Sequence, residues 1–460
     1  MKNTRRQFLQ SVSVTAAAAS VPMYYSKSAH AVSSANDRKT VACVGVGGSR
    51  GRYNRGGKVA RQAAKLGQAI AVCDVDYRHN EEFGADLKKT MNADVNPYID
   101  YRQMLEQEKP DIVTIGTPDH WHVPIAIASM KAGADVYCEK PLTLTIQEGI
   151  DICKVVKETG KVFQVGTQQR SEMGQMFLRA VAIVQCGLIG DDIKVDLAVG
   201  GAPKGGPFVG SEPPADLDWN MWLGPAPKAL YSDERRRMFR WFFEYSGGKM
   251  TDWGAHHIDI ATWAMGKDAT GPVKVSGSGS LPPCVPEDFD FPKWFAGDLL
   301  LPNAYNTATD FHLKLEYADG MEMNVHSNYV SEDGKTKFPN GILFQGSEGR
   351  FFVNRGKLTG APIEKMSEAD KVRVEEKMLE LYGSKPNGHM QNFYDCIDSR
   401  KDPISDVYSH HRTMTSAHLC NIALMLGRDL NWDPKNQVFI GDDQAEALKS
   451  RPQREGFTMK

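Results

Sequence analysis

The chain has 460 residues, of which 41% are hydrophobic and 24% are charged, and its formal net charge at pH 7 is -2. These are the values of an ordinary globular protein that is too long for one hydrophobic core, so we expect two domains. The near-neutral charge, without a basic stripe that carries interleaved aromatic residues, argues against nucleic-acid binding, and no apolar stretch approaches the roughly 20 residues of a membrane span.

The N-terminal residues have the pattern of an export signal. A twin-arginine pair lies in residues 4–9, a mild apolar stretch follows in residues 11–21, and residues 29–31 have the small-x-small pattern of a cleavage site. We therefore expect residues 1–31 to be a twin-arginine signal peptide. Because the twin-arginine machinery carries folded proteins, we expect the protein to be periplasmic or otherwise exported, with its cofactor already bound.

Short apolar runs alternate with helical patterns over residues 39–166. This succession predicts a Rossmann-type domain, a doubly wound parallel sheet with right-handed crossovers. The expected strands are residues 40–45, 69–73, 111–116, 134–138 and 161–165, and the expected helices are residues 57–66, 80–91, 123–132 and 146–159.

A glycine-rich turn follows the first expected strand, where it can bring backbone amides close to a pyrophosphate. Its glycines are Gly45, Gly47, Gly48 and Gly51. The third glycine of the usual GxGxxG pattern comes one residue late, and position 50 is an arginine. At the end of the second strand, Asp74 stands where a carboxylate can bind both ribose hydroxyls and repel a 2′-phosphate. We therefore expect NAD as the cofactor, with NADP less favoured.

Two more loops begin at carboxyl strand ends, where such sheets bind ligands. The loop of residues 117–122 begins with Thr117 and is expected to line the cofactor site. Its two histidines and one aspartate lack a further ligand at a suitable spacing, so we expect no metal site. In residues 138–141 a proline ends the strand, and Lys140 is either a solvated loop lysine or a partly desolvated group suited to proton transfer.

After residue 166 the pattern changes to strands without regular intervening helices. They predict a larger, mostly antiparallel open sheet in an α+β domain over residues 167–460, with the tail around residues 432–434 packing back on the body. The expected strands are residues 192–199, 272–277, 311–317, 322–327, 341–346 and 350–353, and a helix is expected over residues 413–426. The densest basic run, residues 235–237, is expected to be a solvated loop.

Residues 247–259 contain a second polar cluster on an expected helix. Asp252 and His256 are four residues apart, so they face the same way, and the carboxylate can hold the imidazole tautomer and raise its basicity. Such a pair suits general acid–base chemistry on an alcohol or a carbonyl. The alternatives are an ordinary hydrogen bond on a helix surface and a zinc site, which would lack the glutamate of an HExxH motif.

Four motifs of this chain, taken in order, resemble those of the Gfo/Idh/MocA oxidoreductases. They are the glycine-rich turn, the TPxxxH loop, the EKP motif of residues 139–141 and the GG-x3-D-x-G-x-H-x-x-D segment. These oxidoreductases are the relatives of glucose–fructose oxidoreductase and inositol dehydrogenase. The resemblance runs from about residue 39 to the C-terminus and includes secreted-branch features at residues 218–225 and 432–434. It implies a Rossmann domain, a second α/β domain with an open sheet, and a homo-oligomer, either a dimer or a tetramer.

The resemblance also implies roles for single residues. It places Lys140 beside the nicotinamide and the reacting hydroxyl, and it matches Asp252 and His256 to the catalytic aspartate and histidine, with His256 as the proton acceptor. The matching cofactor-pocket positions are Pro118, His122 and Glu139. Side chains suited to carbohydrate contact are Trp121, Arg170, Tyr245, His257 and His389, and His257 could instead pack behind His256.

We therefore expect an NAD(P)-dependent oxidoreductase that moves a hydride between a sugar or polyol hydroxyl carbon and a tightly bound nicotinamide cofactor. Free NAD is scarce outside the cytoplasm, so the cofactor should be regenerated within one active-site cycle. One alternative is an NAD-dependent glycoside hydrolase that uses transient oxidation and elimination. The other is an exported sugar-binding protein without catalytic activity.

Overall fold

The computed structural model of the chain describes residues 38–50 and 54–459. The expected signal peptide, residues 1–31, and Gly51 of the glycine-rich turn lie outside the described residues. Within the described part of the chain, no helix is both long enough and apolar enough to cross a membrane.

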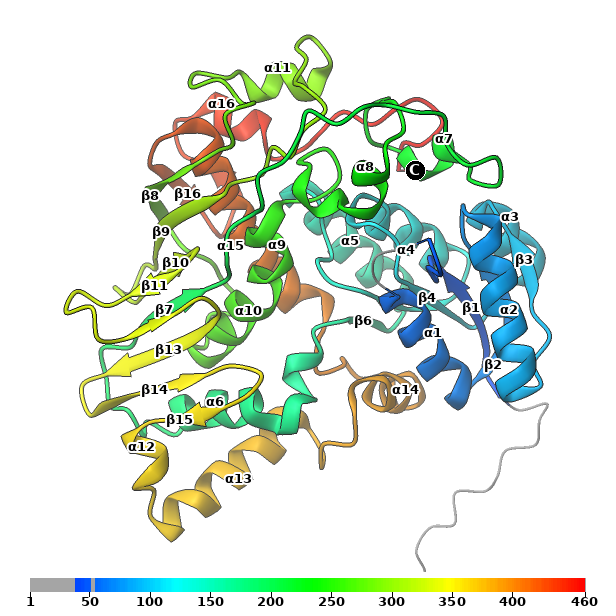
Figure 1. Cartoon of the computed structure of the whole chain (residues 1–460). Helices are drawn as coiled ribbons and strands as arrows, with labels where there is room; N and C mark the ends of the chain where they lie inside the picture. Colours follow the sequence, from blue (N-terminus) through cyan, green and yellow to red (C-terminus); the bar gives the residue numbers. More distant parts are fainter. Residues whose placement is uncertain (1–37, 51–53, 460) are drawn as a thin grey trace, which may run out of the picture. The chain divides into compact units, whose positions relative to one another are not determined.

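The first sheet has six parallel strands in the order β3-β2-β1-β4-β5-β6 (Figure 1). They are β1 (Thr40–Val44), β2 (Gln68–Cys73), β3 (Asn96–Tyr98), β4 (Ile112–Ile115), β5 (Asp135–Cys138) and β6 (Phe163–Val165). The doubly wound parallel sheet is therefore confirmed. The apolar pattern did not indicate β3, because this edge strand is the short, exposed sequence Asn-Pro-Tyr.

Helices cover both faces of this sheet, as the buried side chains of its strands require. The helices α3 (Tyr101–Glu108), α4 (His122–Lys131) and α5 (Ile146–Thr159) pack on one face. The helices α1 (Arg55–Leu66), α2 (Tyr77–Met91) and α14 (His389–Ser399) pack on the other. Since α14 comes from the C-terminal part of the chain, residues far along the sequence help to cover this face of the first sheet.

The second sheet has nine strands in the order β15-β14-β13-β7-β10-β9-β8-β16-β17. Only β10 and β7 pair in parallel, so the sheet is mixed and mostly antiparallel, as expected. Its strands are β7 (Lys194–Ala198), β8 (Lys274–Ser280), β9 (Asp310–Glu316), β10 (Glu322–His326), β13 (Gly341–Gly346), β14 (Gly349–Val353), β15 (Leu358–Thr359), β16 (Leu430–Asp433) and β17 (Val438–Phe439). A separate hairpin pairs β11 (Tyr329–Val330) with β12 (Lys337–Phe338).

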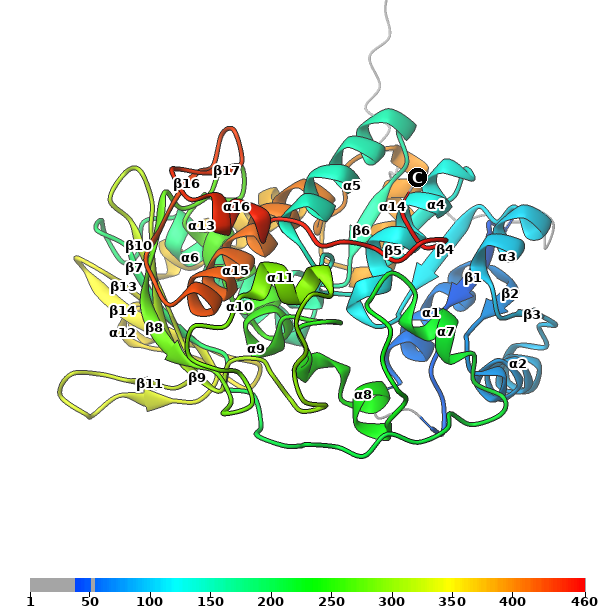
Figure 2. The same ribbon diagram turned by 90° about the horizontal axis from the view of Figure 1, so that it is seen from above.

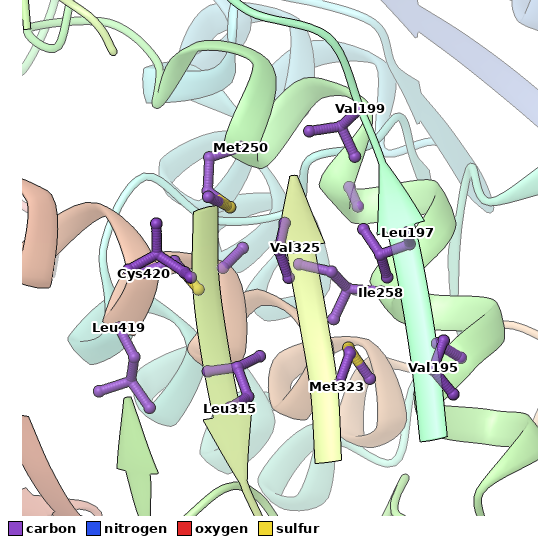
Figure 3. Close-up of a cluster of buried hydrophobic side chains, with 14 of the residues drawn as sticks. Val195, Leu197, Val199, Met250, Ile258, Leu315, Met323, Val325, Leu419 and Cys420 are labelled. Carbon is purple, nitrogen blue, oxygen red and sulfur yellow. The ribbon is translucent and has the colours of Figure 1, made fainter. Parts of the chain in front are cut away.

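One face of the second sheet carries the largest hydrophobic core. The helices α6 (Met176–Gln185), α10 (Gly254–Ala264), α13 (Glu368–Tyr382) and α15 (Val407–Leu426) lie on this side (Figure 2). Alternate residues of the strands point inward, such as Val195 and Leu197 of β7, and they meet Ile258 of α10 (Figure 3). This core holds α10 in place, and α10 carries His256. The remaining helices are α7 (Trp219–Leu223), α8 (Asp233–Arg237), α9 (Gly248–Asp252), α11 (Phe291–Ala296), α12 (Ala361–Glu364) and α16 (Asp443–Ala447).

A buried ion pair joins the segment after β6 to α10. Arg170 donates from Nε and Nη2 to the two carboxylate oxygens of Asp259, at 2.8 and 2.7 Å, and its guanidinium lies 4.7 Å from the ring centre of Trp263. Burial alone would raise the pKa of Asp259, but the charge and hydrogen bonds of Arg170, together with His410, outweigh burial and hold that pKa well below its usual range. Both side chains are almost inaccessible to solvent, so each depends on the other for charge compensation.

We expect Asp259→Ala to lower the free energy of unfolding by about 3–5 kcal/mol, because it leaves the Arg170 charge buried without its carboxylate partner. Urea denaturation followed by tryptophan fluorescence measures this change. As a control, Glu158→Ala removes an exposed partner of Lys154 and should cost less than about 1 kcal/mol. Equal losses in the two variants would contradict the assignment of Arg170 and Asp259 as a structural pair.

Candidate active site

Two hollows meet at the carboxyl ends of β1 and β4. The first, the nucleotide pocket, is lined by the glycine-rich turn, the end of β2 and residues of α7 and α8. The second, the active-site cleft, has a cavity volume of about 390 Å³ and lies between β5 and the helices α9 and α10. Their walls share Arg55, Gly116, Thr117 and Arg240, so a ligand can extend from one hollow into the other.

The glycine-rich turn is shaped for close backbone contact. Gly45 and Gly47 have φ angles of 71° and 63°, which favour glycine, and both residues line the nucleotide pocket. A Cβ atom on Gly56, in the first turn of α1, would lie only 1.9 Å from the carbonyl oxygen of Gly45. The start of α1 is thereby held against the turn, which is the arrangement that presents helix amides to a pyrophosphate. Gly48 instead faces side chains of α2 and does not line the pocket.

Asp74 directly follows β2 and lines the nucleotide pocket, as its sequence position predicts. Its carboxylate accepts hydrogen bonds from the backbone N–H groups of Gly47 and Asp76, each at 3.0 Å. The carboxylate is therefore fixed beside the turn, where a cofactor ribose would lie. Pro118 and Trp121 line the same pocket, and the Trp121 Nε1–H donates to the carbonyl oxygen of Met221 at 3.0 Å.

The expectation of a solvated loop at residues 235–237 is wrong. These residues belong to α8, and Arg235 and Arg236 are buried. Arg236 pairs with Asp76, and Arg50 donates to both carboxylate oxygens of Asp216 at 2.5 Å. These partners are distant in sequence, so no local pattern indicates that the α8 segment forms a wall of the nucleotide pocket.

Lys140 and Asp252 form the central ion pair of the active-site cleft. The ammonium group donates to Asp252 Oδ1 at 2.6 Å and to the Asp252 carbonyl oxygen at 2.9 Å. Arg240 Nε lies 3.3 Å from the same Oδ1 atom. Burial would raise the pKa of Asp252, but Lys140 and Arg240 outweigh burial and hold that pKa well below its usual range. The carboxylate is therefore charged and holds the ammonium group in place.

His256 lies in the first turn of α10 and lines the same cleft. Burial, followed by the charge of Lys140, lowers its pKa well below the ordinary value, so the ring is neutral near pH 7. Among the described residues, no group forms a hydrogen bond with the buried Nδ1 atom. The expected contact between Asp252 and His256 is not formed, because the Asp252 carboxylate turns toward two cations, which are stronger partners than an imidazole.

The loops after β4 and β5 are linked through His122. Its ring lies between the carbonyl oxygens of Pro141, at 2.6 Å from Nδ1, and Thr117, at 3.0 Å from Nε2. Glu139 accepts hydrogen bonds from Arg55 Nε at 3.0 Å and Gln168 Nε2 at 2.8 Å. His122, Thr117 and Glu139 all line the cleft.

The other expected carbohydrate contacts do not line the active-site cleft, because buried partners hold each of them elsewhere. Arg170 is paired with Asp259, and Tyr245 Oη accepts a hydrogen bond from Arg235 at 3.0 Å. The ring of His257 bonds to Asn340 at 3.0 Å, and the ring of His389 bonds to Ser171 at 2.9 Å and to the Val165 carbonyl oxygen at 2.8 Å.

The sequence analysis assigned no role in the site to several cleft residues. They are Arg55, Asp119, Gln168, Arg240, Trp241, Lys249, Trp253 and Arg355. Asp119 is buried, which raises its pKa to about 6, and its carboxylate accepts a hydrogen bond from Ser246 at 2.5 Å. Across the described residues, no group of three or more His, Cys, Asp or Glu side chains is placed to hold a metal ion.

Parts of this chain are similar in sequence to a dehydrogenase, a glycosyl hydrolase and another oxidoreductase. D-glucoside 3-dehydrogenase of Escherichia coli is 27% identical over 258 residues, which are 52% of this chain and 68% of that protein. A glycosyl hydrolase family 109 protein of Shewanella sp. is 29% identical over 125 residues, 26% of this chain and 27% of that protein. This chain is also similar to an oxidoreductase of Bacillus subtilis, but the similar region spans only 32% of that protein.

The fold is also shared with myo-inositol 2-dehydrogenase of Lactobacillus plantarum, at a TM-score of 0.53 and 19% identity over 86% of this chain and 99% of that one. Two profiles of one oxidoreductase family match the chain. The NAD-binding Rossmann fold matches residues 39–167, and the C-terminal α/β domain matches residues 183–280 and 306–459, more than half of the chain. The chain therefore belongs to the Gfo/Idh/MocA family of oxidoreductases, and its first sheet is the NAD-binding Rossmann domain of that family.

Proposed function

We propose that the protein is an NAD-dependent oxidoreductase that moves a hydride between a CH–OH carbon of a sugar or polyol and its cofactor. The observation that carries this proposal is the Lys140–Asp252 pair, which lies with a neutral His256 in the cleft that continues from the nucleotide pocket. The E. coli D-glucoside 3-dehydrogenase is similar over half of this chain, which supports a carbohydrate substrate.

The site residues have complementary tasks in this reaction. His256 is neutral and accepts the hydroxyl proton, as a general base must. Lys140 donates a hydrogen bond to the same oxygen as negative charge develops on it, while Asp252 holds the ammonium group in position. The bound nicotinamide supplies the acceptor or the donor of the hydride.

The nucleotide pocket fits NAD better than NADP. Asp74 presents a fixed carboxylate beside the glycine-rich turn, where it would accept hydrogen bonds from ribose hydroxyls and repel a 2′-phosphate. Asp76, next to it, is neutralised by Arg236, so this arginine does not offset the negative charge of Asp74.

A second candidate function is redox-assisted glycoside hydrolysis. The similarity to a family 109 glycosyl hydrolase, at an identity close to that of the dehydrogenase, favours it. Release of free sugar from an aryl glycoside without net formation of reduced cofactor would distinguish this function from simple dehydrogenation.

We expect Lys140→Met and His256→Ala each to lower kcat/KM by about 10²–10⁴, because each removes a group that acts on the reacting oxygen. A panel of sugars and inositols, followed by the absorbance of reduced nicotinamide, measures the rates. Lys154→Met removes an exposed lysine of α5 and should leave the rates unchanged. Near wild-type turnover in either active-site variant would refute its assigned role.

We expect Asp74→Ala to reduce the preference for NAD over NADP by about 10–100-fold, because hydrogen bonds to a charged group and the repulsion of a 2′-phosphate are both lost. Mass spectrometry after equilibration with an equal mixture of the two dinucleotides measures the occupancy. The matched control is Asp94→Ala, which changes an exposed carboxylate. An unchanged ratio in Asp74→Ala would show that other groups select the cofactor.

We also propose that residues 1–31 direct twin-arginine export and that the cofactor leaves the cytoplasm with the folded protein. The wall that α7 and α8 add to the nucleotide pocket supports retention of the cofactor. We expect the periplasmic fraction to contain protein with about one dinucleotide per chain, and a variant with both Arg5→Lys and Arg6→Lys to stay in the cytoplasm. Periplasmic protein without dinucleotide would contradict cofactor retention.

A further inference from the structure

The active-site cleft carries more positive than negative charge. Five basic and three acidic side chains line it. The basic residues are Arg55, Lys140, Arg240, Lys249 and Arg355, and the acidic residues are Asp119, Glu139 and Asp252. The two histidines that line the cleft, His122 and His256, have lowered pKa values and are neutral near pH 7. Even with all three carboxyl groups ionised, two positive charges remain in excess.

Three of the five cations balance the negative charges of the three carboxyl groups. Arg55 pairs with Glu139 at 3.0 Å. Lys140 and Arg240 both lie within 3.3 Å of Asp252, and their charges also act to lower the pKa of Asp119, the third carboxyl group. The excess positive charge therefore belongs to the other two cations.

Those two cations, Lys249 and Arg355, lie on aromatic rings of the same cleft. Lys249 Nζ is 5.5 Å from the ring centre of Trp241, and the Arg355 guanidinium is 4.4 Å from that of Trp253. Arg355 Nε donates to Gln169 Oε1 at 3.1 Å, which leaves the two terminal nitrogens for a ligand. Within residues 38–50 and 54–459, no carboxylate forms an ion pair with either cation.

The cofactor phosphates do not explain these charges. The basic residues of the nucleotide pocket are Arg55, Arg236, Arg237 and Arg240, and neither Lys249 nor Arg355 lines that pocket. Both cations instead act on the catalytic groups: Lys249 helps to lower the pKa of Asp252, and Arg355, after burial and Lys140, helps to lower that of His256. A group that neutralises them would lie on the substrate side of the cleft.

We propose that the substrate is an anionic sugar or polyol, whose carboxylate or phosphate is bound by Arg355 and Lys249. This inference rests on the proposed oxidoreductase function and names its substrate class. The planar guanidinium, which lies 4.4 Å from the ring centre of Trp253, offers a pair of parallel N–H donors that match the two oxygens of such a group, and the lysine adds a compact charge. Electrostatic attraction in a partly buried cleft also favours capture of an anion.

Matched sets of sugars test this proposal on the full holoenzyme. The sets are D-glucose, D-glucuronate and D-glucose 6-phosphate, and D-galactose, D-galacturonate and D-galactose 6-phosphate. Single-turnover reduction of the bound cofactor gives kcat/KM for each compound. We expect at least one acid or phosphate to exceed its neutral parent by about 10-fold or more, the scale of one charge-assisted hydrogen bond. Comparison of the uronate with the 6-phosphate in each set shows whether the site prefers a carboxylate or a phosphate.

Charge-removal variants then assign the preference to the two side chains. We expect Arg355→Gln and Lys249→Gln to lower the ratio of kcat/KM for the preferred anion to kcat/KM for its neutral parent by about 10-fold, with partial recovery of this ratio in Arg355→Lys. Lys357→Gln, on an exposed lysine of the same loop that lies over Phe352 rather than in the cleft, is the matched control.

The results distinguish failure of the anionic-substrate proposal from failure of the oxidoreductase function. Equal or faster turnover of the neutral sugars, or equal losses for neutral and anionic sugars in Arg355→Gln, would overturn the anionic substrate but not the oxidoreductase function. Failure of every sugar to reduce the bound cofactor would contradict the oxidoreductase function itself.

Discussion

The ion pair between Lys140 and Asp252 is the contact on which the active site depends. It joins residues 112 positions apart, one in the loop after a strand of the Rossmann sheet and the other at the end of α9. Because α10 follows α9 directly, the same contact sets His256 beside the lysine. The loop after β4 is tied to this arrangement through the His122 ring, which bonds to the carbonyl oxygen of Pro141.

Burial and a concentration of cations explain the protonation states of the site. Burial lowers the pKa of the imidazole of His256, and the adjacent ammonium group of Lys140 lowers it further, so the histidine is a neutral base near pH 7. The same cations keep the pKa of Asp252 low although the carboxylate is buried. In the proposed function, a site with this charge balance would stabilise an oxyanion, and the cations without carboxylate partners would bind the negative group of the proposed substrate.

The nucleotide pocket is built by both halves of the chain. Asp76, the residue just before α2, is buried and needs a cation, which Arg236 of α8 supplies. Arg50 of the glycine-rich turn donates to the carboxylate of Asp216, which lies just before α7. These ion pairs hold the α7–α8 segment against the Rossmann sheet and give the pocket a wall that the sheet alone does not provide.

The sequence by itself determined the two sheets, the glycine-rich turn and the positions of Lys140, Asp74 and His256, because strand patterns, turns and strand ends are local properties. It did not indicate that Asp252 would bond to Lys140 rather than to His256, or that Arg170 would be a structural partner of Asp259. It also gave no sign that Arg240, Lys249 and Arg355 would share one cleft. Only the tertiary structure decided these pairings, because the energy of a buried charge depends on which groups the fold places within a few ångströms of it, whatever their separation in sequence.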